Sequence, residues 1–180
     1  MICGKVWTGE PHPSRLAAAR DRPVRTLALA LVLLSTPALA RKPPPEITAA
    51  ALAAARARPL AGHTLDTRDL LLAIAEHESR FRPDIARCAV LGDHGRAHGT
   101  YQLHPEAFGD HSAAEVCASP RLQARLALFV LHAYLKLAPE LGVEGAVRGY
   151  ASGRPRQATS AAREIMALWR ARRAARRARP

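Results

Sequence analysis

The apolar run Leu27–Leu34 (LALALVLL) limits how much of this chain can contribute to a fold. It follows Arg25 and precedes Ser35-Thr36-Pro37 and the small-x-small site Ala38-Leu39-Ala40. This pattern is typical of an export leader, and the run is too short for a membrane span, which needs roughly 20 apolar residues. We therefore predict a signal peptide over residues 1–40, cleaved after Ala40, and an exported protein in the periplasm or outside the cell.

The part of the leader that precedes the apolar run is long for a signal peptide. It contains Glu10, Asp21 and several prolines, which are unusual before such a run. We therefore expect translation to start near Val24, and N-terminal sequencing of unprocessed precursor would test this.

Two cysteines, Cys88 and Cys117, follow the predicted cleavage site, because Cys3 leaves with the leader. In an oxidising compartment such a pair favours a disulfide, which here would close a loop of about 30 residues and stabilise by roughly 3 kcal/mol. The alternative is a pair of buried free thiols. No cysteine directly follows the cleavage site, so we expect no lipid anchor.

The chain is strongly basic, with 27 Lys and Arg against 15 Asp and Glu and a net charge of +12. For an exported protein this favours anionic polymers such as cell-wall glycan, although an arginine-rich source would give a similar composition. The C-terminal run WRARRAARRARP holds many of the arginines. We expect residues 171–180 to form a solvated, fraying basic tail; the alternative is a tail that binds an anionic envelope surface. We expect no nucleic-acid partner.

Proline positions and apolar spacing divide the rest of the chain into helices. The linker RKPPP opens the segment 41–59, whose alanine-rich part, Ile47–Arg58, is the first predicted helix. The main domain is predicted over residues 60–170. Its first predicted helix runs from Asp66 or Thr67 to before Pro83, with Asp69 as a capping partner in the first turn. Three further helices are predicted from Ser119-Pro120 to about Leu137, over Val143–Tyr150, and from Ser160 to about Arg173. The Gly- and His-rich segment Cys88–Tyr101 suggests an irregular or β-hairpin insert. The predicted class is mainly α (α+β), as a monomer.

Two glutamates near the end of the helix before Pro83 are predicted to lie in different environments. Glu78 continues the stripe of Leu70 and Ile74 at i, i+4, i+8, whereas Glu76 lies about 200° away around the helix. Burial disfavours a charged carboxylate, so Glu78 should have a raised pKa and suit general acid catalysis. A simple ion pair with a nearby arginine is the alternative. Glu76 is assigned to solvent, so Glu76→Gln should leave most activity.

Three motifs in order extend this argument: Glu78-Ser79-Arg80-Phe81-Arg82-Pro83, Gly99-Thr100-Tyr101-Gln102-Leu103-His104-Pro105, and Gly149-Tyr150-Ala151-Ser152-Gly153. Over roughly residues 60–170 the chain resembles the catalytic domain of the soluble lytic transglycosylases. That family has E-S-x-F-x-P at a helix end, a hairpin close to G-x-x-Q-x-x-P and a later A-Y-N-A-G. The resemblance implies a lysozyme-like helical fold with a small β-hairpin insert.

The resemblance also implies roles for individual residues. Glu78 would act as acid and then base on the β-1,4 bond between N-acetylmuramic acid and N-acetylglucosamine, forming a 1,6-anhydro product. Ser79 would position substrate or a polar partner of the acid, Tyr101 would stack on sugar, and Gln102 would hydrogen-bond sugar. Tyr150 would orient the Glu78 carboxyl through its hydroxyl. Core packing for the tyrosines and a strand-edge amide for Gln102 are the alternatives.

This sequence departs from the family pattern at two places. Ser152 replaces the family's Asn, and the pair Thr100-Tyr101 is bulkier than the family's small apolar pair. Both bear on substrate fit, so a non-catalytic peptidoglycan-binding module on the same fold remains an alternative. A lysozyme-type hydrolase is another, because such enzymes use a second carboxylate. The sequence offers Asp84, Asp93, Glu106 and Asp110, none at a position that the motifs mark.

A cluster of histidines around HGRAH invites a zinc interpretation. The residues are Asp93, His94, His98, His104 and His111. The motif HExxH does not occur, since Phe81 stands where its second histidine would follow His77-Glu78. We therefore predict no metal and no cofactor, with the histidines forming loop hydrogen bonds.

Overall fold

The computed structural model describes residues 41–179, and within them the chain is mainly helical. The predicted leader, its cleavage site and the proposed start near Val24 lie outside the described residues. The helices are α1 (Pro45–Ala57), η1 (Leu60–Gly62), α2 (Thr64–Ser79), α3 (Pro83–Ala86), η2 (Asp93–Gly95), η3 (Pro105–Ala107), α4 (Ala113–Ala118), α5 (Pro120–Leu137), η4 (Pro139–Leu141), α6 (Gly142–Ser152) and α7 (Ser160–Arg177). The predicted helices are confirmed, with ends shifted by a few residues.

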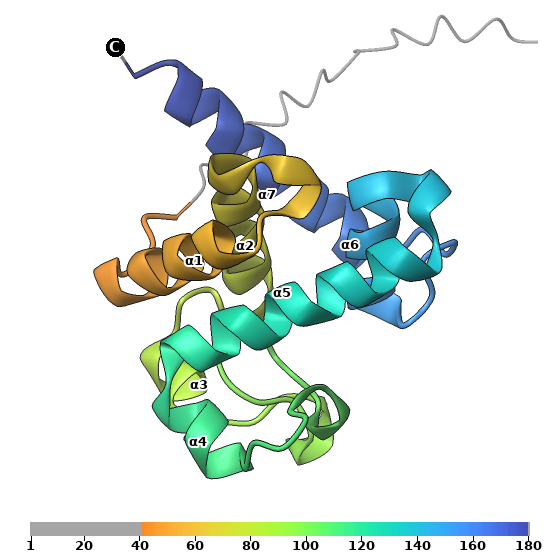
Figure 1. Ribbon diagram of the computed structural model, residues 1–180. Helices are drawn as coiled ribbons and strands as arrows, with labels where there is room; N and C mark the ends of the chain where they lie inside the picture. The colour runs from red at the N-terminus through yellow and green to blue at the C-terminus, as the bar shows by residue number, and fades with distance from the viewer. Residues whose placement is uncertain (1–40, 180) are drawn as a thin grey trace, which may run out of the picture. The chain divides into compact units, whose positions relative to one another are not determined.

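Helix α2 is central, because α1 and α7 both pack against it (Figure 1). Every residue from Leu70 to Glu76 is buried, so this helix has no solvent-facing side between these two residues. Helix α5 packs on α1 and α6, and α6 also contacts α7. The long helices α2 and α7 are far apart in the sequence but pack against each other.

Small side chains explain how α1 approaches its neighbours. Pro45 begins the helix, and its buried face consists of Ile47 and the alanines Ala50, Ala51, Ala54 and Ala55. Alanine is the best helix former and leaves little volume between helix axes, so α1 can pack closely against α2 and α5. The predicted alanine-rich helix thus belongs to the core.

Side-chain caps fix the starts of α4 and α5. The Ser112 hydroxyl accepts from the backbone N–H of Glu115, whose carboxylate in turn accepts from the backbone N–H of Ser112. Ser119 caps α5 by accepting from the N–H of Leu122, with Pro120 in the first turn. The predicted start at Ser119-Pro120 is therefore confirmed.

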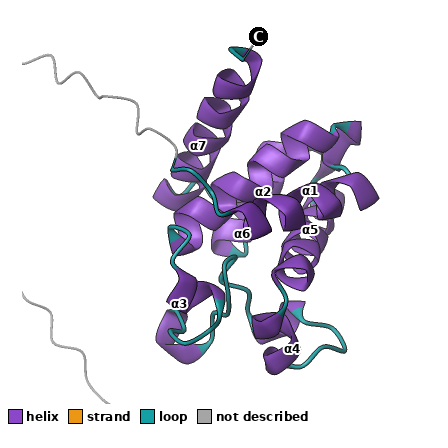
Figure 2. Ribbon diagram, turned by 90° about the vertical axis from the view of Figure 1, so that its left-hand side faces the viewer, coloured by secondary structure: helices purple, strands orange, loops and turns teal. Residues whose placement is uncertain are grey.

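The segment between α3 and α4 differs from the predicted β-hairpin. In the described chain it contains no strand, only two isolated antiparallel bridges, Gly92 with Ala97 and His98 with Leu103 (Figure 2). Short turns interrupt any longer pairing, since Asp93, His94 and Gln102 all have positive φ. The small β-hairpin insert is thus reduced to a chain of tight turns.

The C-terminal arginines form part of a helix rather than a fraying tail. Helix α7 extends to Arg177, and Arg172, Arg173 and Arg176 pair with acids of α2. The predicted solvated tail was therefore wrong for these residues. It failed because the acids that hold them come from a helix about a hundred residues earlier in the sequence.

Within residues 41–179 no single helix combines the length and apolar character needed to cross a membrane. The helices Pro120–Leu137 and Pro139–Ser152, which are bent by 107° relative to each other, reach that length and apolar character only when they are taken together.

Candidate functional site

Glu78 lies one residue before the end of α2 and is partly buried. Burial raises the pKa of its carboxyl from the ordinary 4.5 to about 7. In the described part of the chain its carboxyl has no ion pair, so no cation offsets the burial. The predicted raised pKa is confirmed, and a carboxyl with this pKa can both donate and accept a proton near neutral pH.

Glu76 does not face solvent as predicted: it is 7% exposed. Its carboxylate pairs with the Arg172 guanidinium of α7 and accepts a hydrogen bond from the backbone N–H of Arg41. Helical periodicity predicted the wrong environment for Glu76, because α1 and α7 both pack against α2. Glu76→Gln would consequently disturb the core, so it cannot serve as the neutral control that the helix angle suggested.

Asp69 was also misassigned, as a capping partner in the first turn. The helix begins at Thr64, and Asp69 is a buried residue that pairs with Arg176. Asp66, Asp69 and Glu76 lie on one face of α2, and the arginines of α7 lie opposite them. A signal for this existed in the sequence: acids at i, i+3 and i+10 on one helix and arginines at i and i+4 on another.

The chain turns sharply just beyond Glu78. Arg80 and Phe81 both have positive φ, 51° and 58°, which is costly for residues other than glycine. The Ser79 hydroxyl donates to the carbonyl of Ala75 and accepts from the N–H of Phe81. Ser79 is buried and holds this turn, so its predicted contact with substrate is not supported.

Tyr150 bonds to the Tyr101 backbone and lies close enough to Glu78 for the charge of that carboxyl to affect it. The Tyr150 hydroxyl donates to the carbonyl oxygen of Tyr101 at 2.6 Å, rather than to the Glu78 carboxyl as predicted. Burial raises the pKa of the Tyr150 hydroxyl well above its usual value, and the negative charge of Glu78 adds to this shift. Tyr150 therefore shares the electrostatic environment of Glu78 while its own hydrogen bond fixes the loop.

Tyr101 is 1% exposed and thus has no face free for stacking on a sugar. That prediction was wrong, and the core alternative is correct. Burial also raises the pKa of its hydroxyl, which is buried without a hydrogen-bond partner among residues 41–179. An unpaired buried hydroxyl normally costs free energy, so it is an uncommon feature of a folded protein.

Gln102 adopts a positive φ of 48°, and its side-chain amide donates to the carbonyl of Gly99 at 3.0 Å. The Oε1 atom of Gln102 lies so close to Gly92 that a Cβ on Gly92 would be 1.8 Å from it. Gln102 therefore holds the loop together, and it also lines a groove beside α5 and α6.

This groove has a volume of about 580 Å³ and contains polar and aromatic side chains from three segments. They are Gln102, His104 and Glu106 from the loop, Phe129 and Tyr134 from α5, and Tyr150 from α6. Phe129 is 58% exposed, which leaves an aromatic face available. Glu78 is not among the lining residues; Tyr150 is the lining residue whose pKa responds to it.

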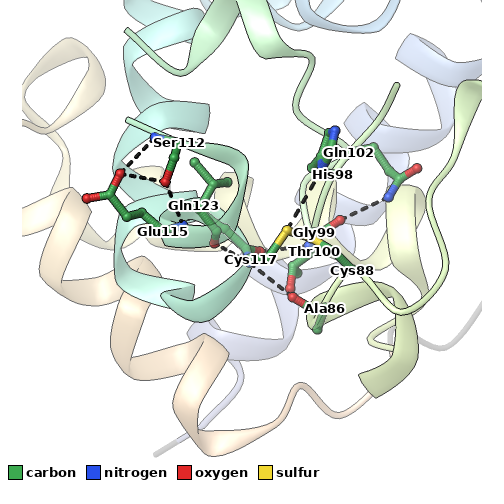
Figure 3. The surroundings of a disulfide bond; sticks show 11 residues. Ala86, Cys88, His98, Gly99, Thr100, Gln102, Ser112, Glu115, Cys117 and Gln123 are labelled. Atoms are coloured by element: carbon green, nitrogen blue, oxygen red, sulfur yellow. Dashed lines mark hydrogen bonds between the residues drawn. A yellow bond between two sulfur atoms is a disulfide. The ribbon is translucent and has the colours of Figure 1, made fainter. Parts of the chain in front are cut away.

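Gln123, a residue that the sequence motifs do not mark, organises the loop. This fully buried side chain accepts from the N–H of Thr100 and donates to the carbonyls of Ala86 and Val116 (Figure 3). Gly99 is required beside it, because a Cβ there would lie 2.5 Å from the Gln123 amide. A polar residue on the apolar face of a predicted helix was the available signal.

The predicted disulfide between Cys88 and Cys117 is present and connects the end of α3 to α4 (Figure 3). His98 lies 3.8 Å from the Cys117 sulfur, so two sulfurs and an imidazole form a cluster within 4.8 Å. The disulfide leaves no thiolate for a metal ion, because metal ligation requires the deprotonated thiol. The predicted lack of a metal stays a prediction for metal analysis.

Ser152, the last residue of α6, supports the local turn. Its hydroxyl donates to the carbonyl of Arg148 and accepts from the N–H of Arg154, while Gly153 ends α6 with φ 71°. The Ser152 hydroxyl therefore stabilises the turn after α6, and Ser152 also lines the groove.

Comparison with known proteins gave no relative: no protein-family model, no curated protein and no solved structure matches this chain.

Proposed function

We propose that this protein is an exported lytic transglycosylase that cleaves peptidoglycan on a lysozyme-like helical fold. The observation that carries the proposal is the pKa of about 7 at Glu78, at the end of a core helix. Its support from the sequence is the ordered set of motifs, which share their glutamate, glutamine and tyrosine with that enzyme family.

In the proposed reaction the protonated Glu78 donates its proton to the glycosidic oxygen between N-acetylmuramic acid and N-acetylglucosamine. The bond from C1 to that oxygen breaks. The Glu78 carboxylate then accepts the proton of the muramyl C6 hydroxyl, whose oxygen bonds to C1. No water is consumed, and a 1,6-anhydro sugar leaves. A single carboxyl is sufficient because the nucleophile belongs to the substrate and is held close to C1.

The glycan would bind in the groove lined by Gln102, Phe129 and Tyr150. An exposed aromatic ring such as Phe129 suits the apolar face of a sugar, and amide and hydroxyl groups suit its hydroxyls. The overall charge of +12 also favours an anionic envelope as the working surface.

Two observations favour alternatives on the same fold. Glu78 does not line the groove, which fits a binding module that holds glycan without cleaving it. Glu106 does line the groove, and its pKa is lowered by its backbone hydrogen bond and by Arg96, so it stays ionised. An ionised second carboxylate is what a lysozyme-type hydrolase would use.

Digestion of purified sacculi by the wild type and by Glu78→Gln tests the proposal. The wild type should release 1,6-anhydromuropeptides, and Glu78→Gln should lose at least about 100-fold of the rate, as expected for a general acid. Glu140→Gln, an exposed glutamate paired with Arg156, is the matched control and should keep full activity.

The products separate the three functions. Products with a free reducing end, together with loss of activity in Glu106→Gln, would favour the hydrolase. Sacculus binding without any soluble product from the wild type would favour the binding module.

A further inference from the structure

The Glu76 carboxylate holds two segments that are distant in sequence. Its Oε1 accepts a hydrogen bond of 2.6 Å from the backbone nitrogen of Arg41, and its Oε2 accepts from an Arg172 Nη2 at 2.5 Å. The same Arg172 nitrogen donates to the Arg41 carbonyl at 2.9 Å. Both ends of the Arg41 backbone are therefore bound, one to α2 and one to α7.

The environment of this carboxylate favours a charged partner. The side chains of Glu76 and Arg172 are only 8% and 9% exposed. Hydrogen bonds in such a site are stronger when the donor is charged as well as the acceptor. One oxygen of Glu76 accepts from a charged donor, Arg172, whereas the donor to the other oxygen within residues 41–179 is a neutral backbone amide. A groove of about 460 Å³, lined in part by Arg41, Glu76 and Glu164, gives access to this place.

The residue at this position is the one that follows the predicted cleavage site. The small-x-small site ends at Ala40, so removal of the leader would make Arg41 the first residue of the mature chain. We propose that Glu76 is the binding site for the new amino terminus that leader removal creates. The ligand is an α-ammonium group, supplied by this chain itself.

The step is hydrolysis of the Ala40–Arg41 peptide bond by a signal peptidase, with water as co-reactant. The carbon–nitrogen bond breaks, the water oxygen remains on Ala40 as a carboxylate, and the Arg41 nitrogen becomes an ammonium near neutral pH. That nitrogen already lies at hydrogen-bond distance from Glu76. A neutral donor is thereby replaced by a charged one without movement of the chain.

The consequence extends to the end of α2. Arg172 also lies over the Phe81 ring, at 5.6 Å, just after Glu78. Contacts among the new terminus, Glu76 and Arg172 thus stabilise the end of α2, where Glu78 lies. The folded state therefore becomes more stable when the leader is removed. This inference depends on cleavage after Ala40 and is independent of the chemistry proposed for Glu78.

The test uses the full-length precursor, exported and processed in cells. In one variant, Ser-Gly is inserted between Ala40 and Arg41, which keeps the cleavage site but moves the ammonium two residues away from Glu76. N-terminal sequencing should give Arg41 for the wild type. Thermal unfolding should show a midpoint lowered by about 3 °C in the insertion variant, the shift expected when a charged hydrogen bond becomes a neutral one.

A double-mutant cycle assigns this shift to Glu76. In the Glu76→Gln background the insertion should have no effect. In the Glu164→Gln background, which changes a glutamate 66% exposed on the same groove, the full shift should remain. An equal shift in all backgrounds, or a mature chain that begins at another residue, would overturn the proposal.

A second measurement needs no substitution at Glu76, so it stands even if Glu76→Gln fails to fold. The α-amine of the processed wild type should react with an acylating reagent several-fold more slowly than that of the insertion variant, since a paired ammonium gives up its proton less readily. Equal reaction rates would contradict a bound terminus.

Discussion

The Tyr150 hydroxyl donates a hydrogen bond of 2.6 Å to the carbonyl of Tyr101, and so ties α6 to the loop across 49 residues of sequence. Tyr150→Phe leaves that carbonyl without its partner. We expect the free energy of unfolding to fall by about 1–3 kcal/mol, measured by urea denaturation. Tyr134→Phe, which removes a hydroxyl on the same groove, should change it much less. Equal losses in both would show that the bond contributes little.

Tyr101→Phe should have the opposite effect, although the two tyrosines are neighbours. Its hydroxyl is buried and has no partner in the part of the chain that the structure describes, so its removal takes away a desolvation cost and leaves the ring in place. The expected result is unchanged or higher stability in the same urea experiment. A loss as large as that of Tyr150→Phe would mean that the Tyr101 hydroxyl has a partner in solution.

The pKa of Glu78 predicts how stability depends on pH. The carboxyl has a pKa of about 7 in the folded chain and near 4.5 when unfolded, so the folded state binds the proton more tightly. Stability contributed by this group is complete below pH 4.5 and is lost as the pH rises through about 7. Glu78→Gln should abolish this dependence and be more stable than the wild type at pH 8, by about 2–3 kcal/mol. Unfolding at pH 4 and pH 8 measures it, and parallel curves for both proteins would contradict the raised pKa.

Gln123 of α5 should contribute more to the stability of the loop than any polar side chain of the loop itself. Gln123→Met keeps the length of the side chain but leaves the N–H of Thr100 and the carbonyls of Ala86 and Val116 without their partner. We expect a loss of about 3 kcal/mol or more, because each buried unpaired group costs about 1 kcal/mol or more. Hydrogen exchange at Thr100 should rise in the same variant. Unchanged protection of that amide would show that another group replaces the glutamine.

Some of the C-terminal arginines should stabilise the fold through ion pairs with α2, and the exposed ones should bind the cell wall. Deletion of residues 171–180 removes Arg172, which pairs with Glu76, and Arg176, one of the two arginines that pair with Asp69. It should destabilise by about 3 kcal/mol or more, as expected when buried charges lose counter-ions. The double variant Arg177→Gln and Arg179→Gln alters only exposed arginines, so the fold should be unaffected. Its binding to sacculi at low salt should weaken. Full wall binding by that variant would exclude these arginines as envelope contacts.

Local features of the sequence determined most of the secondary structure. Ser119-Pro120 begins α5 because a hydroxyl cap and a proline satisfy the first turn without any tertiary contact. The pair Cys88 and Cys117 forms the disulfide, and Glu78 has the raised pKa that its place on the apolar stripe predicts. The cap and the raised pKa depend on neighbours in sequence or on a single periodic face, and the disulfide was predictable because Cys88 and Cys117 are the two cysteines after the predicted cleavage site.

Tertiary structure decided what periodicity could not. Glu76 is buried because arginines from α7 cover the side of α2 that a lone helix would expose to water. Tyr101 is core and Tyr150 bonds a backbone carbonyl because a loop and a distant helix meet there. Turns with positive φ replace the predicted hairpin, since the buried Gln123 amide holds the loop through partners far apart in sequence. Charge pairing and loop packing involve partners that no local pattern can identify.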